Sequence, residues 1–272
     1  MSLASPEPAR PFFLQRGPRQ LFCLHHAPAG VSRGAVVHVP AFAEEMNKSR
    51  RMVSLQSRAL AAAGWHVLQL DLLGTGDSEG DFGDATWPDW LDDVAEARRW
   101  LATAAGHEPW LWGLRLGALL ASASLASQAA PGLLLWQPVV SGKQHLQQFL
   151  RLKAGAEWLA GGREADAQAK PMEQLTAGQM VEVAGYALNP ALALPMAAAT
   201  LVLPESLARL VWFEVSPRAD ATLAPASERV LAPLREGGRL SAAVVQGSSF
   251  WQALEIETVP ALVDAGVVAL SS

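Results

Sequence analysis

The chain has 272 residues and a formal net charge of −5 at pH 7, and half of its residues are hydrophobic while 17% are charged. This composition predicts a large buried core and excludes an extensively disordered chain. The acidic balance argues against a nucleic-acid-binding protein, because phosphate binding needs clustered Lys and Arg side chains. The length is typical of one large α/β domain that carries an insertion.

Cysteine content and apolar runs narrow the class of protein further. Cys23 is the single cysteine, so the sequence excludes an intrachain disulfide and a cysteine-based metal site. We expect no metal and no cofactor. Residues 1–14 contain three prolines and no apolar run, which predicts that no signal peptide is present. The most apolar stretch, residues 187–204, is interrupted by Pro190 and Pro195, so we expect a cytoplasmic protein that does not span a membrane.

Short apolar runs alternate with helical patterns along the chain. One helical pattern includes residues 59–63, and others cover Trp87–Ala104 and Leu116–Gln128. Such alternation is typical of βαβ units and predicts an α/β protein with a doubly wound, mostly parallel sheet. The predicted strands are, in chain order, Arg19–His25, Ala35–Val39, His66–Leu70, Trp110–Trp112, Leu133–Trp136, Arg209–Val215 and Ser241–Val245.

Residues 142–203 interrupt this alternation between the fifth and sixth predicted strands. The stretch contains the helical patterns Gln144–Leu159 and Met172–Leu188 and no predicted strand. A long structured excursion at one sheet edge is usually a cap over the active-site end. We therefore predict a core made of residues 1–141 and 204–272 and a helical cap made of residues 142–203. Helical packing without a gating role is the alternative.

The segment Gly113–Gly117 reads Gly-Leu-Arg-Leu-Gly, follows an apolar strand and opens a helix rich in Ala and Leu. It resembles the nucleophile elbow of the α/β-hydrolase fold, a strand–turn–helix written Gly-x-Ser-x-Gly. The middle residue of that elbow has a strained backbone, and side chains at the two glycine positions would collide with the neighbouring strand and helix. Both glycines are present here, but Arg115 occupies the position of the serine.

Two upstream segments also resemble that fold. The residues Asp71–Ser78 match the loop pattern Asp-x-x-Gly-x-Gly-x-Ser that follows a strand of α/β hydrolases, and Ala41–Ala43 follow the strand that supplies one amide of the oxyanion hole. The downstream order of strand, cap, strand, strand and helix agrees with the same fold. Together these segments predict an α/β-hydrolase fold with a helical cap insertion.

The chain as a whole is similar to the exosortase A system-associated hydrolases of the type called hydrolase 2. The resemblance rests on the segments Pro40–Arg51, Trp112–Ala118 and Gly247–Trp251 and extends over nearly the full length. It implies a setting in bacterial exopolysaccharide and PEP-CTERM sorting loci, and a sister hydrolase of the same locus as a partner. It does not imply a particular reaction.

A serine hydrolase triad cannot be assembled from the expected positions. Asp220 fits the acid position, but all six histidines precede it, and the segment around Ser249, where the catalytic histidine belongs, contains none. Arg115 cannot replace serine, because a guanidinium is neither a base nor a nucleophile at neutral pH. A literal Gly-x-Ser-x-Gly match places Ser78 at its centre, but no helix follows it, and the loop pattern explains this serine better.

A cation at the start of a helix opposes the helix dipole, so Arg115 needs a negative partner. One interpretation is an internal ion pair with Glu44 or Glu45. The other is a ligand anion that is bound by Arg115 and by the backbone amides of Phe42 and Leu116. Both interpretations hold if the ligand displaces a glutamate.

Several further residues are candidates for the same region. Glu44, Glu45 and Asn47 are candidate pocket residues, although a solvated helix start explains them equally well. His145, near the start of the predicted cap, is a candidate to reach the pocket, whereas His38 inside an apolar strand is expected to be a hydrogen-bonded core residue.

Three functional hypotheses follow. The first is a degenerate hydrolase that binds an anionic or acylated small molecule or saccharide without cleaving it. The second is an active hydrolase or acyl-transfer enzyme that uses Glu44, Glu45 or Asp220 as acid or base. The third is a scaffold subunit that partners the sister hydrolase and has no small-molecule site.

Overall fold

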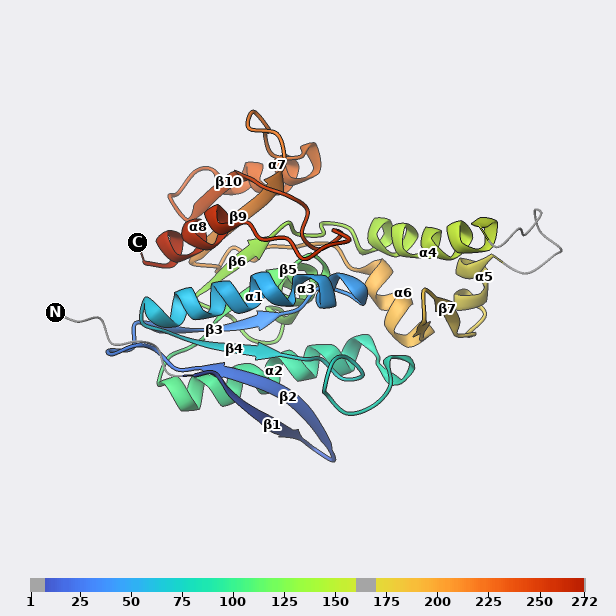
Figure 1. The fold of residues 1–272 in the computed structure, drawn as a ribbon, viewed down its shortest axis with the longest axis horizontal. Coiled ribbons are helices and arrows are strands. Elements are labelled where there is room, and N and C mark those ends of the chain that lie inside the picture. Colours follow the sequence, from blue (N-terminus) through green and yellow to red (C-terminus); the bar gives the residue numbers. More distant parts are fainter. Residues whose placement is uncertain (1–7, 160–169, 272) are drawn as a thin grey trace.

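The computed structural model describes residues 8–159 and 170–271, with an eight-stranded sheet at its centre (Figure 1). Parts of the predicted cap and of the N-terminal segment fall in residues 160–169 and 1–7, which lie outside the described residues. The strand order is β1-β2-β4-β3-β5-β6-β9-β10. The strands are β1 (Arg10–Arg16), β2 (Arg19–His26), β3 (Gly34–Val39), β4 (Trp65–Leu70), β5 (Trp110–Leu114), β6 (Gly132–Trp136), β9 (Arg209–Ser216) and β10 (Leu240–Gln246).

The predicted mostly parallel sheet is confirmed. All pairings from β4 to β10 are parallel, and only β1 with β2 and β2 with β4 run antiparallel. Each of the seven predicted strands is present, with ends that differ by two residues at most. The edge strand β1 was not predicted. It contains Pro11 and a largely exposed Phe13, and such a strand gives a weak apolar signal.

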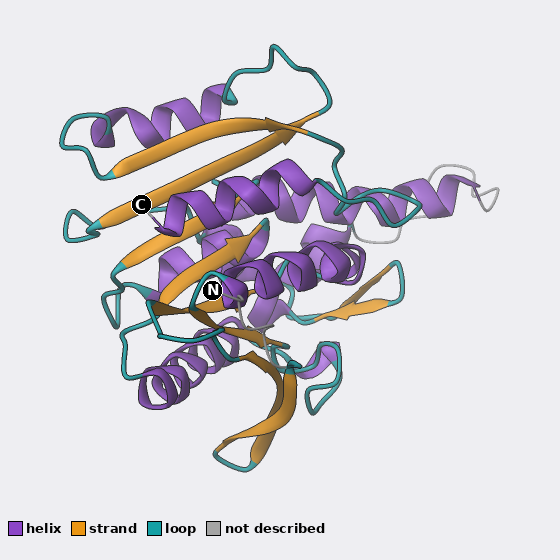
Figure 2. Ribbon diagram, turned by 60° about the vertical axis from the view of Figure 1, so that its left-hand side comes forward, coloured by secondary structure: helices purple, strands orange, loops and turns teal. Residues whose placement is uncertain are grey.

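Helices cover both faces of the sheet (Figure 2). Side chains of a strand point alternately to opposite faces, so Leu133 and Leu135 of β6 pack in one core cluster and Leu134 and Trp136 in the other. The first cluster packs against α2 and α3, and the second against α1 and α8. The helices of the core are α1 (Glu44–Ala62), α2 (Trp87–Ala105), α3 (Leu116–Ser124), α7 (Pro225–Leu231) and α8 (Pro260–Ser271), with short 3-10 helices η1 (Phe82–Asp84) and η2 (Ala232–Leu234).

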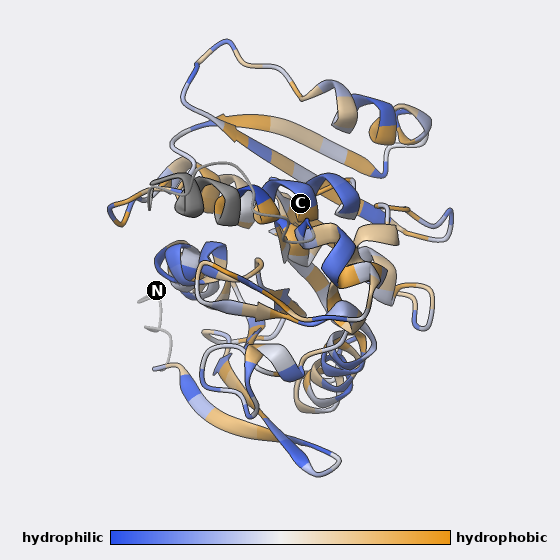
Figure 3. Cartoon of the chain, turned by 90° about the vertical axis from the view of Figure 1, so that its right-hand side faces the viewer, coloured by the Kyte–Doolittle hydropathy of each residue, from blue (hydrophilic) through white to orange (hydrophobic). Residues whose placement is uncertain are grey.

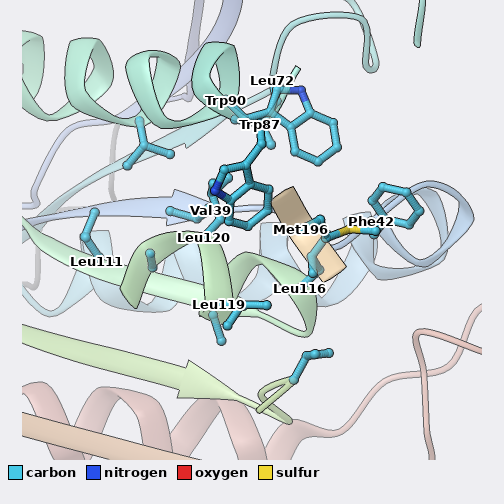
Figure 4. Packing of buried hydrophobic residues seen from close by; sticks show 14 of the residues in the cluster. Val39, Phe42, Leu72, Trp87, Trp90, Leu111, Leu116, Leu119, Leu120 and Met196 are labelled. Atoms are coloured by element: carbon cyan, nitrogen blue, oxygen red, sulfur yellow. The ribbon is translucent and has the colours of Figure 1, made fainter. Parts of the chain in front are cut away.

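The helices show hydrophilic and hydrophobic residues side by side along their length (Figure 3). In α2, for example, Val94, Ala97 and Leu101 are buried at helical spacing, and the helix begins with a Thr86 hydroxyl that accepts a hydrogen bond from the Asp89 amide. This amphipathic pattern made α2 predictable. The start of α3 packs at the end of the first cluster, where Leu116, Phe42 and Met196 are neighbours (Figure 4).

The insertion between β6 and β9 lies beyond the carboxyl ends of the central strands (Figure 1). It consists of α4 (Gly142–Leu159), α5 (Pro171–Thr176), a hairpin of β7 (Val181–Val183) and β8 (Tyr186–Leu188), and α6 (Pro190–Ala198). The first predicted helix is therefore confirmed. The predicted helix Met172–Leu188 is confirmed only to Thr176, where α5 ends, and the expectation of no strand is wrong, because the chain turns at Ala184 and Gly185 into a hairpin.

Gly117→Ala is expected to destabilise the fold by about 1–3 kcal/mol, because a Cβ atom there would collide with the backbone carbonyls of Val39 and Pro40, which cannot move aside easily. Thermal or urea denaturation followed by circular dichroism measures the change. Gly83→Ala is the matched control, since its new Cβ would lie at an ordinary contact distance of 3.4 Å from Ala187 Cβ. Equal stability of the two variants would contradict the predicted steric constraint.

Candidate functional site

The predicted strand–turn–helix around Arg115 is present. β5 ends at Leu114, α3 begins at Leu116, and Arg115 between them has φ 54° and ψ −118°. This backbone conformation is strained for a residue with a side chain. Gly113 and Gly117 permit the bend. A Cβ atom on Gly113 would collide with Ala118, and a Cβ atom on Gly117 would collide with the end of β3. The elbow geometry is therefore complete without a serine.

A second bend of the same kind faces the elbow. Ala43 precedes α1 with φ 50° and ψ −127°, and neither Ala43 nor Arg115 caps its helix with a side-chain hydrogen bond. The amides of Phe42 and Leu116 have no backbone acceptor within residues 8–159 and 170–271. Two uncapped helix N-termini thus lie at one end of the sheet, and partial positive charge at helix N-termini favours a bound anion.

The predicted ion pair of Arg115 forms with Glu45. Arg115 Nε and Nη2 both lie 3.1 Å from Glu45 Oε1, and the side chains of the two residues are only 12% and 18% exposed. Arg115 Nη1 donates a long hydrogen bond of 3.4 Å to the Gln137 carbonyl, and the guanidinium lies 5.4 Å from the ring centre of Trp251. The cation is thus held by one carboxylate oxygen and an aromatic face.

Burial of the ion pair changes the pKa of the Glu45 carboxyl. Removal from water raises the pKa of the Glu45 carboxyl, and the Arg115 charge and the side chain of Gln252 offset part of that rise. A buried pair of this kind is costly to break, because either partner alone would be a buried and unbalanced charge.

The ion pair forms part of the wall of a cavity of about 450 Å³, which lies within the size range of small-molecule sites. Aromatic and aliphatic side chains from three regions of the chain form its apolar wall: Phe42 precedes α1, Phe149 and Leu152 lie on α4, and Trp251 follows β10. The remaining lining residues are polar or charged: Glu44, Glu45, Lys48, Arg115, His145, Gln148 and Gln252.

Of the predicted pocket residues, Glu44, Glu45, Phe42 and Arg115 line this cavity. Glu44 does not contact the arginine and instead accepts hydrogen bonds from the Tyr186 hydroxyl and from Asn47. Asn47 is exposed and does not line the cavity. Leu116 is buried, and only its backbone amide is available to the site.

His145 does reach the cavity. It lies in the first turn of α4, is 6% exposed, and packs edge-on against the Phe42 ring with 5.7 Å between ring centres. Burial, and to a smaller extent the charge of Arg115, lowers the pKa of His145 to about 3, so the imidazole is neutral at neutral pH.

Of the positions that the sequence suggests for a triad, the acid position Asp220 lies outside the cavity wall. Asp220 is exposed and pairs with Arg218 of the same loop, so it does not line the cavity. In the segment after β10, where a catalytic histidine belongs, Trp251 packs its ring against Arg115. Neither Asp220 nor Ser249 therefore contributes to a catalytic triad in the described structure.

Two polar residues that the sequence singled out, Ser78 and His38, make contacts that are structural. The Ser78 hydroxyl donates to the Asp71 carbonyl and accepts from the Phe22 amide, which ties its loop to β2 and explains the serine without catalysis. The expectation of a hydrogen-bonded His38 is wrong in part, because this buried residue leaves its Nε2 without a partner and packs edge-on against Trp112. Burial lowers the pKa of His38 to about 3, which keeps the unpaired ring uncharged.

Sequence reasoning missed the contribution of Lys48, Phe149 and Trp251 to the cavity. Phe149 and Leu152 are spaced three apart on α4, so their common helix face was a usable signal. Trp251 joins the site only through the return of the chain after β10, and no local pattern indicates this contact. No group of metal-ligating side chains occurs among the described residues, and no helix there is both long and apolar enough to cross a membrane.

Comparison with solved structures shows that the chain has the α/β-hydrolase fold. A lidless α/β serine hydrolase from Xanthomonas campestris has a TM-score of 0.60 and 15% identity, covering 98% of this chain and 95% of that one. Est1E from Butyrivibrio proteoclasticus, with ferulic acid bound, has a TM-score of 0.64 and 12% identity, covering 96% of both chains. A proline iminopeptidase-related protein from Thermus thermophilus has a TM-score of 0.58 and 18% identity, covering 97% and 98%. Identities this low establish the fold alone.

The sequence itself defines the family. The model of the family described as serine aminopeptidase, S33 (Hydrolase_4) matches residues 30–186, more than half of the chain, and the protein belongs to this family. No curated protein sequence matches the chain significantly.

A double-mutant cycle tests the buried ion pair. Arg115→Met and Glu45→Gln, alone and together, are expected to show a coupling free energy of about 1–3 kcal/mol in urea unfolding, because each single change leaves one buried charge unbalanced. The exposed pair Arg218 and Asp220 is the control and should couple by less than about 1 kcal/mol. Additive effects of the two buried substitutions would contradict the pairing.

The folded protein is expected to lose stability on acidification through His145. The pKa of His145 is about 3 in the folded chain and near the ordinary 6.5 once unfolded, so the unfolded state takes up the proton first as the pH falls. Relative to His145→Gln, the unfolding free energy should fall by about 1.4 kcal/mol per pH unit between about pH 6 and pH 4. Urea titrations at several pH values measure this slope.

Gln147, an exposed residue on the same helix that does not titrate, provides the control for that measurement. Gln147→Leu should keep the pH dependence of the unmodified protein. A His145→Gln protein with the unmodified slope would show that His145 is protonated in the folded state.

Proposed function

We propose that this protein binds a small amphiphilic anion, with an acyl or aryl part, in the cavity at Arg115 and does not hydrolyse it by a serine mechanism. The observation that carries the proposal is a permanently charged guanidinium at the nucleophile position, in the wall of a cavity of about 450 Å³. Phe42, Phe149, Leu152 and Trp251 form an apolar part of the wall, so an acyl or aryl group is removed from water there.

The contacts of Arg115 leave room for an anion. Both of its hydrogen bonds to Glu45 go to the same oxygen, and the bond from Nη1 to Gln137 is long. A guanidinium carries five N–H donors, so donors remain for a ligand carboxylate. The amides of Phe42 and Leu116 would add neutral donors at two helix N-termini.

The charges in the cavity wall favour an anionic ligand that shares Arg115 with Glu45 or replaces Glu45 as its partner. Arg115 and Lys48 supply two positive charges to the wall, and Glu44 and Glu45 supply two negative charges. Glu44 is already bonded to Tyr186 and Asn47, whereas burial raises the pKa of Glu45 and disfavours its charged form. An incoming anion therefore finds its positive partner most easily where Glu45 is protonated or displaced.

The family resemblance gives this proposal a biological setting. We place the protein with the exosortase A system-associated hydrolases of the hydrolase 2 type, in the cytoplasm, with a sister hydrolase of the same locus as a candidate partner. An acylated or acidic saccharide precursor is a ligand of the required chemistry. In this proposal residues 142–203 are the cap over the site and the remaining residues are the core, because α4 supplies Phe149 and Leu152 to the wall.

A second candidate function is acid–base catalysis by Glu45 on a substrate oriented by Arg115. The raised pKa of this carboxyl, inside a cavity, is the observation that favours it. Asp220 does not line the cavity and pairs with Arg218 in an exposed position, so this candidate does not include it.

Binding of decanoate tests the first candidate. Isothermal titration calorimetry should show decanoate binding, and Arg115→Met should weaken it by about tenfold or more, because the substitution removes a charge-assisted hydrogen-bonding partner. Neutral 1-decanol should bind both proteins with similar affinity. Arg218→Met, which removes an exposed arginine outside the cavity, is the matched control and should leave decanoate affinity unchanged.

Three results would contradict the proposal: no binding of decanoate, equal affinity of the unmodified protein and Arg115→Met, or hydrolysis of p-nitrophenyl decanoate. If hydrolysis is seen and Glu45→Gln abolishes it, the second candidate function holds instead.

A further inference from the structure

His145 is a buried polar side chain at the cavity that the proposed anion site leaves unused. The residue is 6% exposed, and neither ring nitrogen makes a hydrogen bond to any described residue, with Nε2 fully buried. Buried polar groups nearly always have a partner, and leaving one without a partner costs free energy. Its position on α4 therefore needs an explanation beyond packing against Phe42.

The ring lies between two cavities. Besides the larger cavity of about 450 Å³, a smaller one of about 140 Å³ is lined by residues 138–141, Gln144 and three side chains that line both spaces: Arg115, His145 and Gln148. The larger space has an apolar part of its wall beside its polar residues, and the smaller contains the polar side chains of Ser141 and Gln144 beside Pro138, Val139 and Val140. Because His145 and Arg115 line both spaces, a ligand whose anionic group contacts Arg115 lies next to His145.

The chemistry of the ring indicates which ligand group it can bind. A neutral imidazole presents one N–H donor and one acceptor nitrogen. A hydroxyl group both donates and accepts, so it can bond to either nitrogen in either tautomer. A second carboxylate would only accept, and a methylene group would leave the ring unpartnered.

We infer that the ligand is a hydroxy acid, whose carboxylate binds Arg115 and whose hydroxyl group hydrogen-bonds to the imidazole of His145. The inference rests on the proposed function, since it names the ligand class of the same site. His145 is then the residue that selects hydroxylated acids over plain ones. The low pKa of this histidine agrees with its role as a neutral hydrogen-bonding group.

Sites that hydrogen-bond a ligand hydroxyl reject the analogue without it, because the polar group of the protein is then left buried and unpaired. The apolar wall by itself cannot supply this selectivity, since it binds the alkyl chain of the hydroxy acid and that of the plain acid about equally. The part of the discrimination between the two acids that is lost when His145 is replaced is therefore the measure of His145.

The test compares decanoate, 2-hydroxydecanoate and 3-hydroxydecanoate by calorimetry. At least one hydroxy acid should bind the unmodified protein about tenfold more tightly than decanoate. In His145→Leu the ratio of the two affinities should fall to about one, and in His145→Gln, which keeps a donor and an acceptor, part of the preference should remain. Gln147→Leu is the matched control on the same helix, because Gln147 is exposed and lines neither cavity, and should keep the full ratio.

The outcomes separate this inference from the function on which it rests. If decanoate binds in an Arg115-dependent way and neither hydroxy acid binds more tightly, the hydroxy-acid inference is overturned and the anion site stands. If the preference exists but survives in both His145 variants, the assignment to His145 is overturned. If none of the three acids binds, the proposed function fails and this inference fails with it.

Discussion

The ion pair between Arg115 and Glu45 is the constraint on which the rest of the site depends. It joins two bends of the chain, one after β5 and one before α1, each with a positive φ at a residue other than glycine. Both bends aim uncapped helix N-termini at the same place, where a positive side chain is unfavourable unless a negative group compensates. Glu45 supplies that charge, and the cavity wall takes its shape around the pair.

The strained bend at Arg115 is maintained by the packing of its two neighbouring glycines. Gly113 and Gly117 keep the helix close to β3 and β5 whichever side chain stands between them. Trp251, in the segment after β10, adds an aromatic ring against the guanidinium. The same fold thus presents a fixed cation and an aromatic face, and a family name alone does not define the chemistry of such a site.

The sequence predicted the parts of the structure that depend on local pattern. The all-apolar run Leu133–Trp136 and the strand–turn–helix at Arg115 could be recognised because burial on both faces and the two glycines leave distinct patterns. The hairpin Val181–Leu188 was missed, because its Ala-Gly turn has positive φ at both residues but lies in a sequence with few turn signals. The ion pair was predicted only as a choice between two neighbouring glutamates, since helix phase decides which one points inward.

The contacts that could not be predicted come from distant segments. Gln137 and Phe149 reach Arg115 or its cavity from the connection after β6, and Trp251 reaches it from the segment after β10. Neither spacing nor composition records which side chains of such connections meet, because that depends on how each loop packs in three dimensions.

The opposed pKa shifts of Glu45 and His145 set the order in which the cavity gains protons on acidification. Burial raises the pKa of the carboxyl and lowers that of the imidazole, so Glu45 takes up a proton before His145 does. A serine–histidine site would first charge its imidazole and lose its base. In this cavity the first proton instead removes the negative charge of Glu45. Acidification therefore makes a nearly neutral cavity positively charged while His145 is still uncharged.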